Sequence, residues 1–350
     1  MARTFGESSS TADLATGVRP LCTARFDADV SAMTNTSPNG ASPAPAQLVA
    51  SIGSTVVGRR REIELVVAAL VADRHIVIEG PPGTGKSTLL RTVAHELGVG
   101  FEFVEGNAEL TPSRLVGHFD PARVLAEGYD ADVFVDGPLA AALRDGSLLY
   151  VEEINRVPEE TLNVLITVMS EGELHVPRLG RLAAAPGFRL VAAMNPFDAI
   201  GTARISGAVY DRVCRLAVDY QTATDEQLIT ERASGVGGLD PEWVGKVVEL
   251  VRRTRSHGDL RVGSSVRGAI DMCAVASSLA AVRDSSVVAG DVSLDAALVA
   301  LSGRIRLREG STRSTEDIVR ELWLDVFGRK DDDGPSKGKV DAPNGATTAA

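Results

Sequence analysis

The chain has 350 residues, of which 44% are hydrophobic, and it carries a formal net charge of −11. This length provides for about two domains with a sizeable core. The net acidity argues against sequence-independent binding to nucleic acid, because neutralisation of phosphate dominates that affinity, and we do not expect nucleic acid as a partner.

The cysteines and the hydropathy pattern indicate in which cellular compartment the protein works. Cys22, Cys214 and Cys273 are widely spaced. They lack the spacing of metal ligands, and we expect them to be reduced and unpaired. No apolar run reaches the ~18 residues of a membrane span. No apolar segment follows a basic start, as it would in a signal peptide. These features predict a cytoplasmic protein with no membrane contact.

Composition divides the chain into four segments. Residues 1–47 are rich in Ser, Thr, Ala, Pro and Gly, and residues 329–350 are similar, so both are expected to be disordered tails. Between them, residues 48–221 read as an α/β domain. Residues 222–328 read as a smaller helical domain.

The strands of the α/β domain are predicted from short apolar runs that alternate with helical patterns. Because continuous apolar strands between helices are typical of a parallel sheet covered on both faces, the fold class is α/β. The runs are HIVIEG at 75–80, FEFVEG at 101–106, LLYVEE at 148–153, FRLVAAMN at 188–195 and CRLAVDY at 214–220.

The second domain is predicted to be all helical. In DPEWVGKVVELVRRTR, Asp240 is suited to the N-cap and Pro241 to the first helical position. Two further helical patterns follow, SVRGAIDMCAVASSLAAV and DVSLDAALVALSGRI. Ser264 or Ser265 can cap the first of them.

A glycine-rich turn lies between the first strand and a helix. It matches the pattern G-x-x-x-x-G-K-[ST], whose backbone N–H groups form an anion nest at a helix N-terminus. Lys86 is expected to reach the β- and γ-phosphates of ATP, and the hydroxyl of Ser87 to ligate Mg²⁺. The predicted nucleotide-binding residues are Gly80, Pro81, Pro82, Gly83, Thr84, Gly85, Lys86, Ser87 and Thr88.

Two carboxylates follow the apolar run LLYV, namely Glu152 and Glu153. Adjacent strand residues point to opposite faces, so one carboxylate can face the metal and the next a water. We expect Glu152 to hold Mg²⁺ and Glu153 to polarise the attacking water, which favours hydrolysis over phosphoryl transfer to another acceptor. The alternative is a pair of solvated glutamates that begin a turn.

The strand FRLVAAMNP places Asn195 at its end. A strand-end asparagine beside the phosphate loop is suited to hydrogen-bond the γ-phosphate or the attacking water. The alternative is an Asn-Pro turn former.

In their order and spacing, GPPGTGKS, LLYVEEINR, AAMNP and YDRV resemble the AAA+ ATPases. The segment EEINRVPEETLNVLITVMSEGELHVP resembles the MoxR group in particular. The resemblance runs from about Leu48 to about Leu307 and implies an AAA+ P-loop sheet flanked by helices, followed by a small helical lid. One departure is that the family usually has Asp where Glu152 stands, which puts the inner metal geometry in doubt.

The resemblance also implies roles for single residues. Asn195 matches the position called sensor 1, and Arg267 resembles sensor 2, which touches the nucleotide from the lid. Arg212 matches the arginine that AAA+ rings place in the active site of a neighbouring subunit. Arg215 and Arg204 are alternatives for that role, and a surface ion pair with Asp211 is an alternative role for Arg212.

Further segments match features of the MoxR group. Residues 107–147 are too long for one helix with two turns, and a β-element inserted there fits them. GELHVPRLGRLAAAPGFRLV reads as a hairpin before the next strand. In such rings these insertions line the pore or the partner face, although they can also be structural decoration. The stretch 54–75, with Val57 and Gly58, is expected to contact adenine.

The sequence therefore predicts a MoxR-like AAA+ ATPase that forms a homo-oligomeric, hexameric ring. The resemblance implies that hydrolysis of Mg²⁺-bound ATP remodels or matures a protein partner with a von Willebrand factor A-type domain. Two alternatives stay open, a DNA- or RNA-acting AAA+ NTPase and a nucleotide switch that does not hydrolyse.

Overall fold

The computed structural model describes residues 44–196 and 206–328, and these residues belong to one compact unit. Most of both predicted tails lies outside the described residues, as do Arg204 and Cys22. The first helix, α1, begins at Pro45, inside the segment expected to be disordered. Its proline occupies a position at the helix start where a missing N–H is tolerated.

Five parallel strands form the central sheet in the spatial order β2-β5-β8-β1-β9. Each coincides with one of the five apolar runs, so the predicted parallel sheet is confirmed. Their bounds are β1 (His75–Glu79), β2 (Phe101–Glu105), β5 (Leu148–Glu152), β8 (Arg189–Met194) and β9 (Val213–Ala217).

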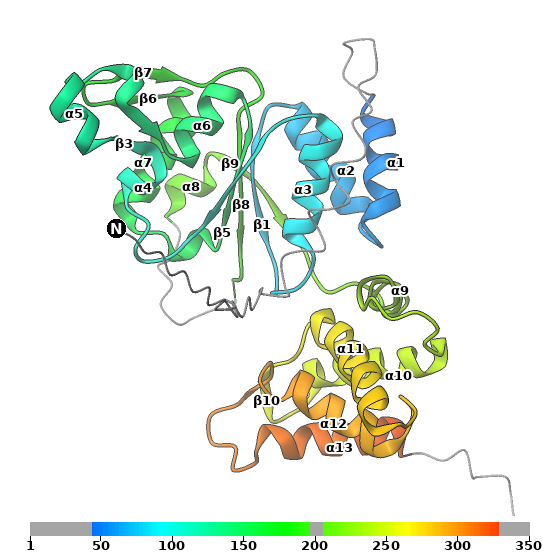
Figure 1. The fold of residues 1–350 in the computed structure, drawn as a ribbon. Coiled ribbons are helices and arrows are strands. Elements are labelled where there is room, and N and C mark those ends of the chain that lie inside the picture. Colours follow the sequence, from blue (N-terminus) through cyan, green and yellow to red (C-terminus); the bar gives the residue numbers. More distant parts are fainter. Residues whose placement is uncertain (1–43, 197–205, 329–350) are drawn as a thin grey trace, which may run out of the picture. The chain divides into compact units, whose positions relative to one another are not determined.

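Helices cover both faces of the sheet (Figure 1). Ile76 and Ile78 of β1 pack in one buried cluster with α1, α2 and α3, whereas Val77 between them packs in a second cluster with α4, α6 and α7. This two-residue alternation is that of a strand buried on both sides. The helices are α1 (Pro45–Thr55), α2 (Arg60–Val71), α3 (Lys86–Leu97), α4 (Pro112–Val116), α6 (Pro138–Asp145), α7 (Glu159–Glu171) and the short α8 (Gly207–Tyr210).

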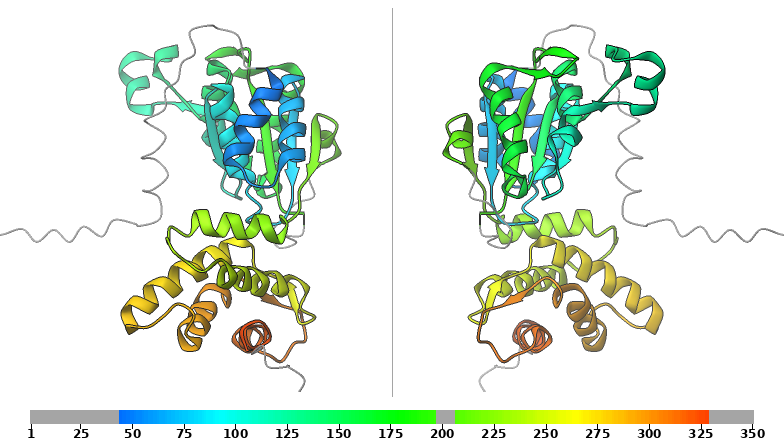
Figure 2. Two further views of the ribbon diagram at one scale, coloured as in Figure 1. Left: turned by 90° about the vertical axis from the view of Figure 1, so that its right-hand side faces the viewer. Right: turned by 90° about the vertical axis from the view of Figure 1, so that its left-hand side faces the viewer.

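Two excursions interrupt the alternation of strands and helices. The first is a β-hairpin of β3 (Gly117–Phe119) and β4 (Phe134–Asp136), which encloses α5 (Pro121–Glu127) and η2 (Ala131–Val133). The second is the predicted hairpin, formed by β6 (Glu173–Val176) and β7 (Gly180–Ala183). Figure 2 shows the first excursion, in teal, standing away from the sheet.

The sequence did not predict α5, although Asp120 caps it by accepting from the N–H groups of Ala122 and Arg123. The two excursions touch through Arg178, whose guanidinium carbon lies 3.9 Å from the ring centre of Tyr129. The inserted β-element is therefore larger than expected and is attached to the second hairpin.

The C-terminal segment has its own hydrophobic core, to which Trp243, Met272, Leu301 and Ile318 contribute. Its helices pack against one another (Figure 2), and Asp240 caps α10 as predicted. An all-helical segment was expected, but a two-stranded antiparallel sheet joins two of its loops. The elements are α9 (Ala223–Ala233), α10 (Pro241–Ser256), β10 (Leu260–Val262), α11 (Val266–Arg283), α12 (Gly290–Leu301), β11 (Arg306–Leu307) and α13 (Thr315–Phe327).

The proposed division at residue 222 falls inside the one compact unit of the described residues, and we keep it as a proposal. Within residues 44–196 and 206–328, no helix is both long and apolar enough to cross a membrane.

Candidate functional site

The glycine-rich turn joins β1, which ends at Glu79, to α3, which begins at Lys86. Gly83 and Gly85 have φ of 72° and 79°, a conformation that glycine adopts without strain. The N–H of Gly80 donates to the carbonyl of Met194 at 3.1 Å. The turn is therefore anchored to β8 and opens at the N-terminus of a helix, where backbone N–H groups favour an anion.

Lys86 lies folded against its own loop. Its ammonium donates to the carbonyls of Gly80 and Pro81, each at 2.9 Å. Burial lowers the pKa of Lys86 to about 8, Arg59 and Arg267 also lower it, and Glu152 and Glu153 raise it. The charges that act on this lysine therefore include three of the predicted site residues, Glu152, Glu153 and Arg267.

Ser87 makes contacts that the sequence reading did not foresee. Its hydroxyl lies 3.2 Å from the hydroxyl of Tyr150 and 3.2 Å from Oε1 of Glu152. Tyr150 is fully buried, and burial raises its pKa, so its hydroxyl stays protonated and needs a partner. This contact could have been predicted from the sequence, because a tyrosine two positions before Glu152 lies on the same face of the strand.

Glu152 and Glu153 point in different directions because the backbone conformation changes between them. We had expected the alternation of side chains along a strand to separate them. β5 ends at Glu152, and Glu153 adopts the left-handed conformation with φ of 52°. Its carboxylate pairs with Nε of Arg156 at 3.1 Å. The left-handed turn, which is uncommon for a residue other than glycine, redirects Glu153 as the chain leaves the sheet.

Asn195 follows directly after β8, where Met194 is paired in register with Glu79. It is half-buried and lies at the same sheet edge as the start of the phosphate loop. Arg267 occupies the first turn of α11, as predicted. A Cβ added at Gly83 would lie 3.9 Å from Cδ of Arg267 and 2.3 Å from the hydroxyl of Ser265. Ser265 is the N-cap of α11, but its side chain makes no capping hydrogen bond.

Arg212 and Arg215 have different surroundings. Arg212 is exposed and donates to the hydroxyl of Ser170 and to the carbonyl of Ala208, so the expected alternative of a pair with Asp211 is not what the structure shows. The guanidinium of Arg215 contacts the buried carboxylate of Glu79. Arg204, the remaining alternative, lies outside the described residues.

Arg59 is a second site residue that the sequence reading did not single out. Its side chain is 4% exposed, and its guanidinium donates to the carbonyl of Thr84 at 3.0 and 3.2 Å and to that of Asp219 at 2.6 Å. It thus ties the phosphate loop to the segment that follows β9.

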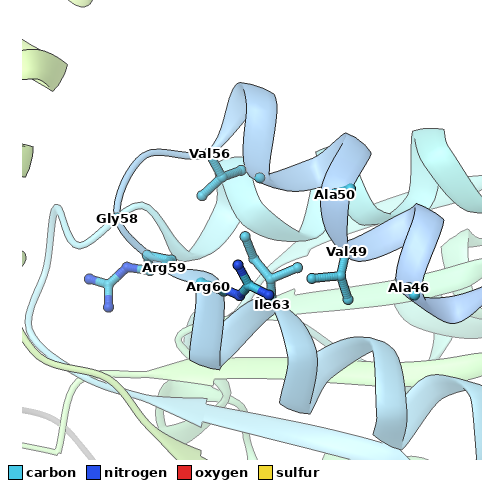
Figure 3. Close-up of a pocket in the computed structure, with 9 residues that line it drawn as sticks. Ala46, Val49, Ala50, Val56, Gly58, Arg59, Arg60 and Ile63 are labelled. Carbon is cyan, nitrogen blue, oxygen red and sulfur yellow. The ribbon is translucent and has the colours of Figure 1, made fainter.

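Beside Arg59, a cavity of about 320 Å³ lies between α1 and α2, lined by Val49, Val56, Gly58 and Ile63 among others. Figure 3 shows the guanidinium of Arg59 pointing out of this cavity. The cavity borders the stretch 54–75, whose expected contact with adenine stays a proposal.

The residues present fit a Mg²⁺-bound nucleotide. The hydroxyl of Ser87 and the carboxylate of Glu152 are hard oxygen donors at hydrogen-bond distance from each other, and Mg²⁺ prefers such ligands. Lys86 and the open helix N-terminus provide positive charge for phosphate. Thr88 is exposed on the first turn of α3.

Comparisons with known proteins show which family and fold this chain resembles. The family AAA domain (dynein-related subfamily) matches residues 75–213. An uncharacterized protein of Staphylococcus aureus strain USA300 is 31% identical over 205 residues, which are 57% of this chain and 77% of that protein. An uncharacterized protein of Staphylococcus epidermidis is 34% identical over 150 residues, which are 42% of this chain and 56% of that protein.

Among solved structures, two point mutants of RuvB from Thermotoga maritima have the same fold. One aligns with a TM-score of 0.51 and 18% identity over 72% of this chain and 73% of that one. The other aligns with a TM-score of 0.50 and 18% identity over 71% and 72%. Together with the family match and the relative from S. aureus, the phosphate loop and its acidic strand show that this chain belongs to the AAA domain family, dynein-related subfamily, and is a nucleotide-binding AAA+ protein.

Proposed function

We propose that this protein is a MoxR-like AAA+ ATPase. It assembles into a hexameric ring, hydrolyses ATP and uses the cycle to remodel or mature a protein partner. The observation that carries the proposal is the division of the site between the two ends of the strands of one sheet.

One set of groups lies at the carboxyl edge of the sheet. Lys86 and Ser87 open α3 after β1, Glu152 ends β5, and Asn195 follows β8. Because β1, β5 and β8 are parallel neighbours, their ends meet at one edge. These groups, with Glu153, act in cis on one nucleotide.

Arg212 lies at the other edge. It precedes β9, whose first residue, Val213, is paired in register with His75 at the start of β1. Five strand residues at ~3.3 Å each place it roughly 16 Å from the edge where the phosphate loop begins. An arginine placed there serves a neighbouring subunit, which supports the trans role and hence the ring.

The chemistry is attack of water on the γ-phosphate. Glu153 orients and polarises this water, Asn195 holds it or the γ-phosphate, and Arg267 contacts the nucleotide from the lid. Mg²⁺ held by Ser87 and Glu152 would neutralise charge on the phosphate oxygens. Lys86 exchanges its bonds to the carbonyls of Gly80 and Pro81 for phosphate oxygens when nucleotide binds.

The identity of the client, which is the protein that the ATPase remodels or matures, is proposed from the resemblance to the MoxR group. The two excursions, joined through Arg178 and Tyr129, provide a surface outside the nucleotide site that can engage a partner. By analogy with the MoxR group, we propose that this partner carries a von Willebrand factor A-type domain.

Hydrolysis per subunit, measured against protein concentration from nanomolar to micromolar with Mg²⁺, tests the proposal. We expect specific activity to rise and saturate as interfaces form. Glu153→Gln should bind ATP without turnover. A specific activity that is nonzero but independent of protein concentration would contradict the trans role of Arg212. Stimulation by DNA that weakens with salt would instead support a nucleic-acid motor, and binding without turnover would support a switch.

The client is tested with the Glu153→Gln protein, which should hold ATP and its partner together. Cross-linking in extract followed by mass spectrometry should enrich a protein with a von Willebrand factor A-type domain. The matched control is Lys86→Ala, which should not bind nucleotide. Equal yields from both variants would refute an ATP-dependent client.

A further inference from the structure

A buried carboxylate connects the strand before the phosphate loop to the segment that carries Arg212. Glu79, the last residue of β1, is 4% exposed. Its Oε1 accepts from the hydroxyl of Tyr210 at 2.7 Å. Its Oε2 accepts from Nε of Arg215 at 2.8 Å, and Nη2 of Arg215 lies 2.5 Å away. Both oxygens of this carboxylate are therefore engaged.

The two partners lie on either side of Arg212 in the chain. Tyr210 ends α8, two residues before Arg212, and Arg215 lies in β9, three residues after it. Burial and the hydrogen bond to Glu79 raise the pKa of Tyr210 to about 12, so its hydroxyl remains a donor. A buried carboxylate holds such partners firmly, because losing either would leave one of its oxygens desolvated and unpaired.

The helical part of this segment is short. α8 has only four residues, which is too short to be stable by itself. The contacts of Arg212 are to a neutral hydroxyl and a carbonyl, so its guanidinium can leave them for a phosphate. β9, which begins directly after Arg212, is held by its ladder to β1, and Val209 of α8 is buried, so Glu79 adds a side-chain anchor on both sides of Arg212.

We propose that Glu79 is a positioning residue for the donated arginine: through Tyr210 and Arg215 it fixes the α8–β9 segment so that Arg212 reaches the neighbouring subunit's nucleotide. The inference rests on the proposed function, because it assumes the trans role of Arg212. Because Glu79 is followed directly by Gly80 of the phosphate loop, nucleotide affinity is measured beside restored activity, so that an effect on the subunit's own site is recognised.

The test uses two kinds of subunit: a donor, which can only supply Arg212, and an acceptor, which can only bind nucleotide. Lys86→Ala subunits donate Arg212 but cannot bind nucleotide, whereas Arg212→Ala subunits bind nucleotide but donate nothing. Mixing them should restore hydrolysis at the interfaces between them. Tyr210→Phe is then placed in the donor alone or in the acceptor alone, and Tyr129→Phe in the donor is the matched control for a lost hydroxyl.

We expect Tyr210→Phe in the donor to lower the restored activity by about tenfold, the cost of a hydrogen bond to a charged group. The same change in the acceptor should leave restored activity and nucleotide affinity within about twofold. Glu79→Gln in the donor should behave like Tyr210→Phe, because its amide still accepts from Tyr210 but pairs poorly with Arg215.

Equal losses in donor and acceptor would show a merely structural role for Tyr210 and overturn the inference. Full activity of the Tyr210→Phe and Glu79→Gln donors would overturn it as well, while leaving the trans role of Arg212 intact. No restoration in the parent mixture at any ratio would overturn both the inference and the proposed ring mechanism.

Discussion

The hydroxyl of Ser87 lies 3.2 Å from the hydroxyl of Tyr150, a residue that is buried in the sheet. Tyr150 also interacts with Glu152, so one phenol serves the two residues proposed to hold Mg²⁺. The ring of Tyr150 is fixed by Phe101 and Phe103, whose ring centres each lie 5.7 Å away. A rigid side chain thus orients the proposed metal ligands.

Tyr150→Phe should keep the packing and lose this orientation. We expect the Mg²⁺ concentration for half-maximal ATP binding to rise about fivefold, the equivalent of one hydrogen bond of ~1 kcal/mol. Titration of fluorescent nucleotide binding with Mg²⁺ measures it, and nucleotide binding without Mg²⁺ is the control. An unchanged Mg²⁺ requirement would show that Ser87 needs no help from Tyr150.

The lowered pKa of Lys86 predicts a proton taken up on nucleotide binding. The free protein releases this proton as the pH rises through about 8, whereas phosphate favours the charged ammonium. Binding at pH 8.5 should therefore take up a fraction of a proton, and binding at pH 7.5 should take up much less. Calorimetry of ADP binding in buffers of different ionisation enthalpy measures this uptake. Zero uptake at both values would mean that Lys86 is fully charged before binding.

Arg59 should contribute more to stability than its neighbour Arg60. Arg59 is 4% exposed and serves the carbonyls of Thr84 and Asp219, whereas Arg60 is 88% exposed and pairs with Glu64. We expect Arg59→Ala to lower the free energy of unfolding by about 3 kcal/mol, because it leaves the buried carbonyl of Thr84 without its donor, and Arg60→Ala by less than ~0.5 kcal/mol. Urea unfolding followed by circular dichroism compares them, and equal losses would contradict the contrast.

The strands and the phosphate loop could be predicted because their signals are local. Five apolar runs and one glycine pattern each depend on neighbouring residues, and all five strands formed where expected. Glu153 was misplaced because a left-handed residue that is not glycine has no clear sequence signal.

The contacts of Glu79, Arg59 and Tyr150 could not be predicted, because each joins residues far apart in the chain. Glu79 meets Tyr210, Arg59 meets Asp219, and Tyr150 meets Ser87 only after the strand order is fixed. The roles assigned to Asn195, Arg212 and Arg267 stay proposals that the variants described here can test.

The glutamate at position 152 offers a last test of how this site differs from its relatives in the MoxR group, which usually have Asp there. Oε1 of Glu152 lies 3.2 Å from the hydroxyl of Ser87, a direct contact. Aspartate is shorter by one methylene, which withdraws the carboxylate by about 1.5 Å and leaves room for a water. If Tyr150 keeps its position, the shorter side chain no longer contacts the hydroxyl of Ser87.

We therefore expect Glu152→Asp to raise the Mg²⁺ concentration for half-maximal hydrolysis by roughly threefold to tenfold, with ATP binding in the absence of Mg²⁺ unchanged. Glu152→Gln, which keeps the length but loses the charge, should raise it further, because a neutral amide is a weaker ligand for a hard cation. A Mg²⁺ requirement that falls in Glu152→Asp would mean that the wild-type glutamate obstructs the metal, and that the contact with Ser87 replaces metal ligation instead of preparing it.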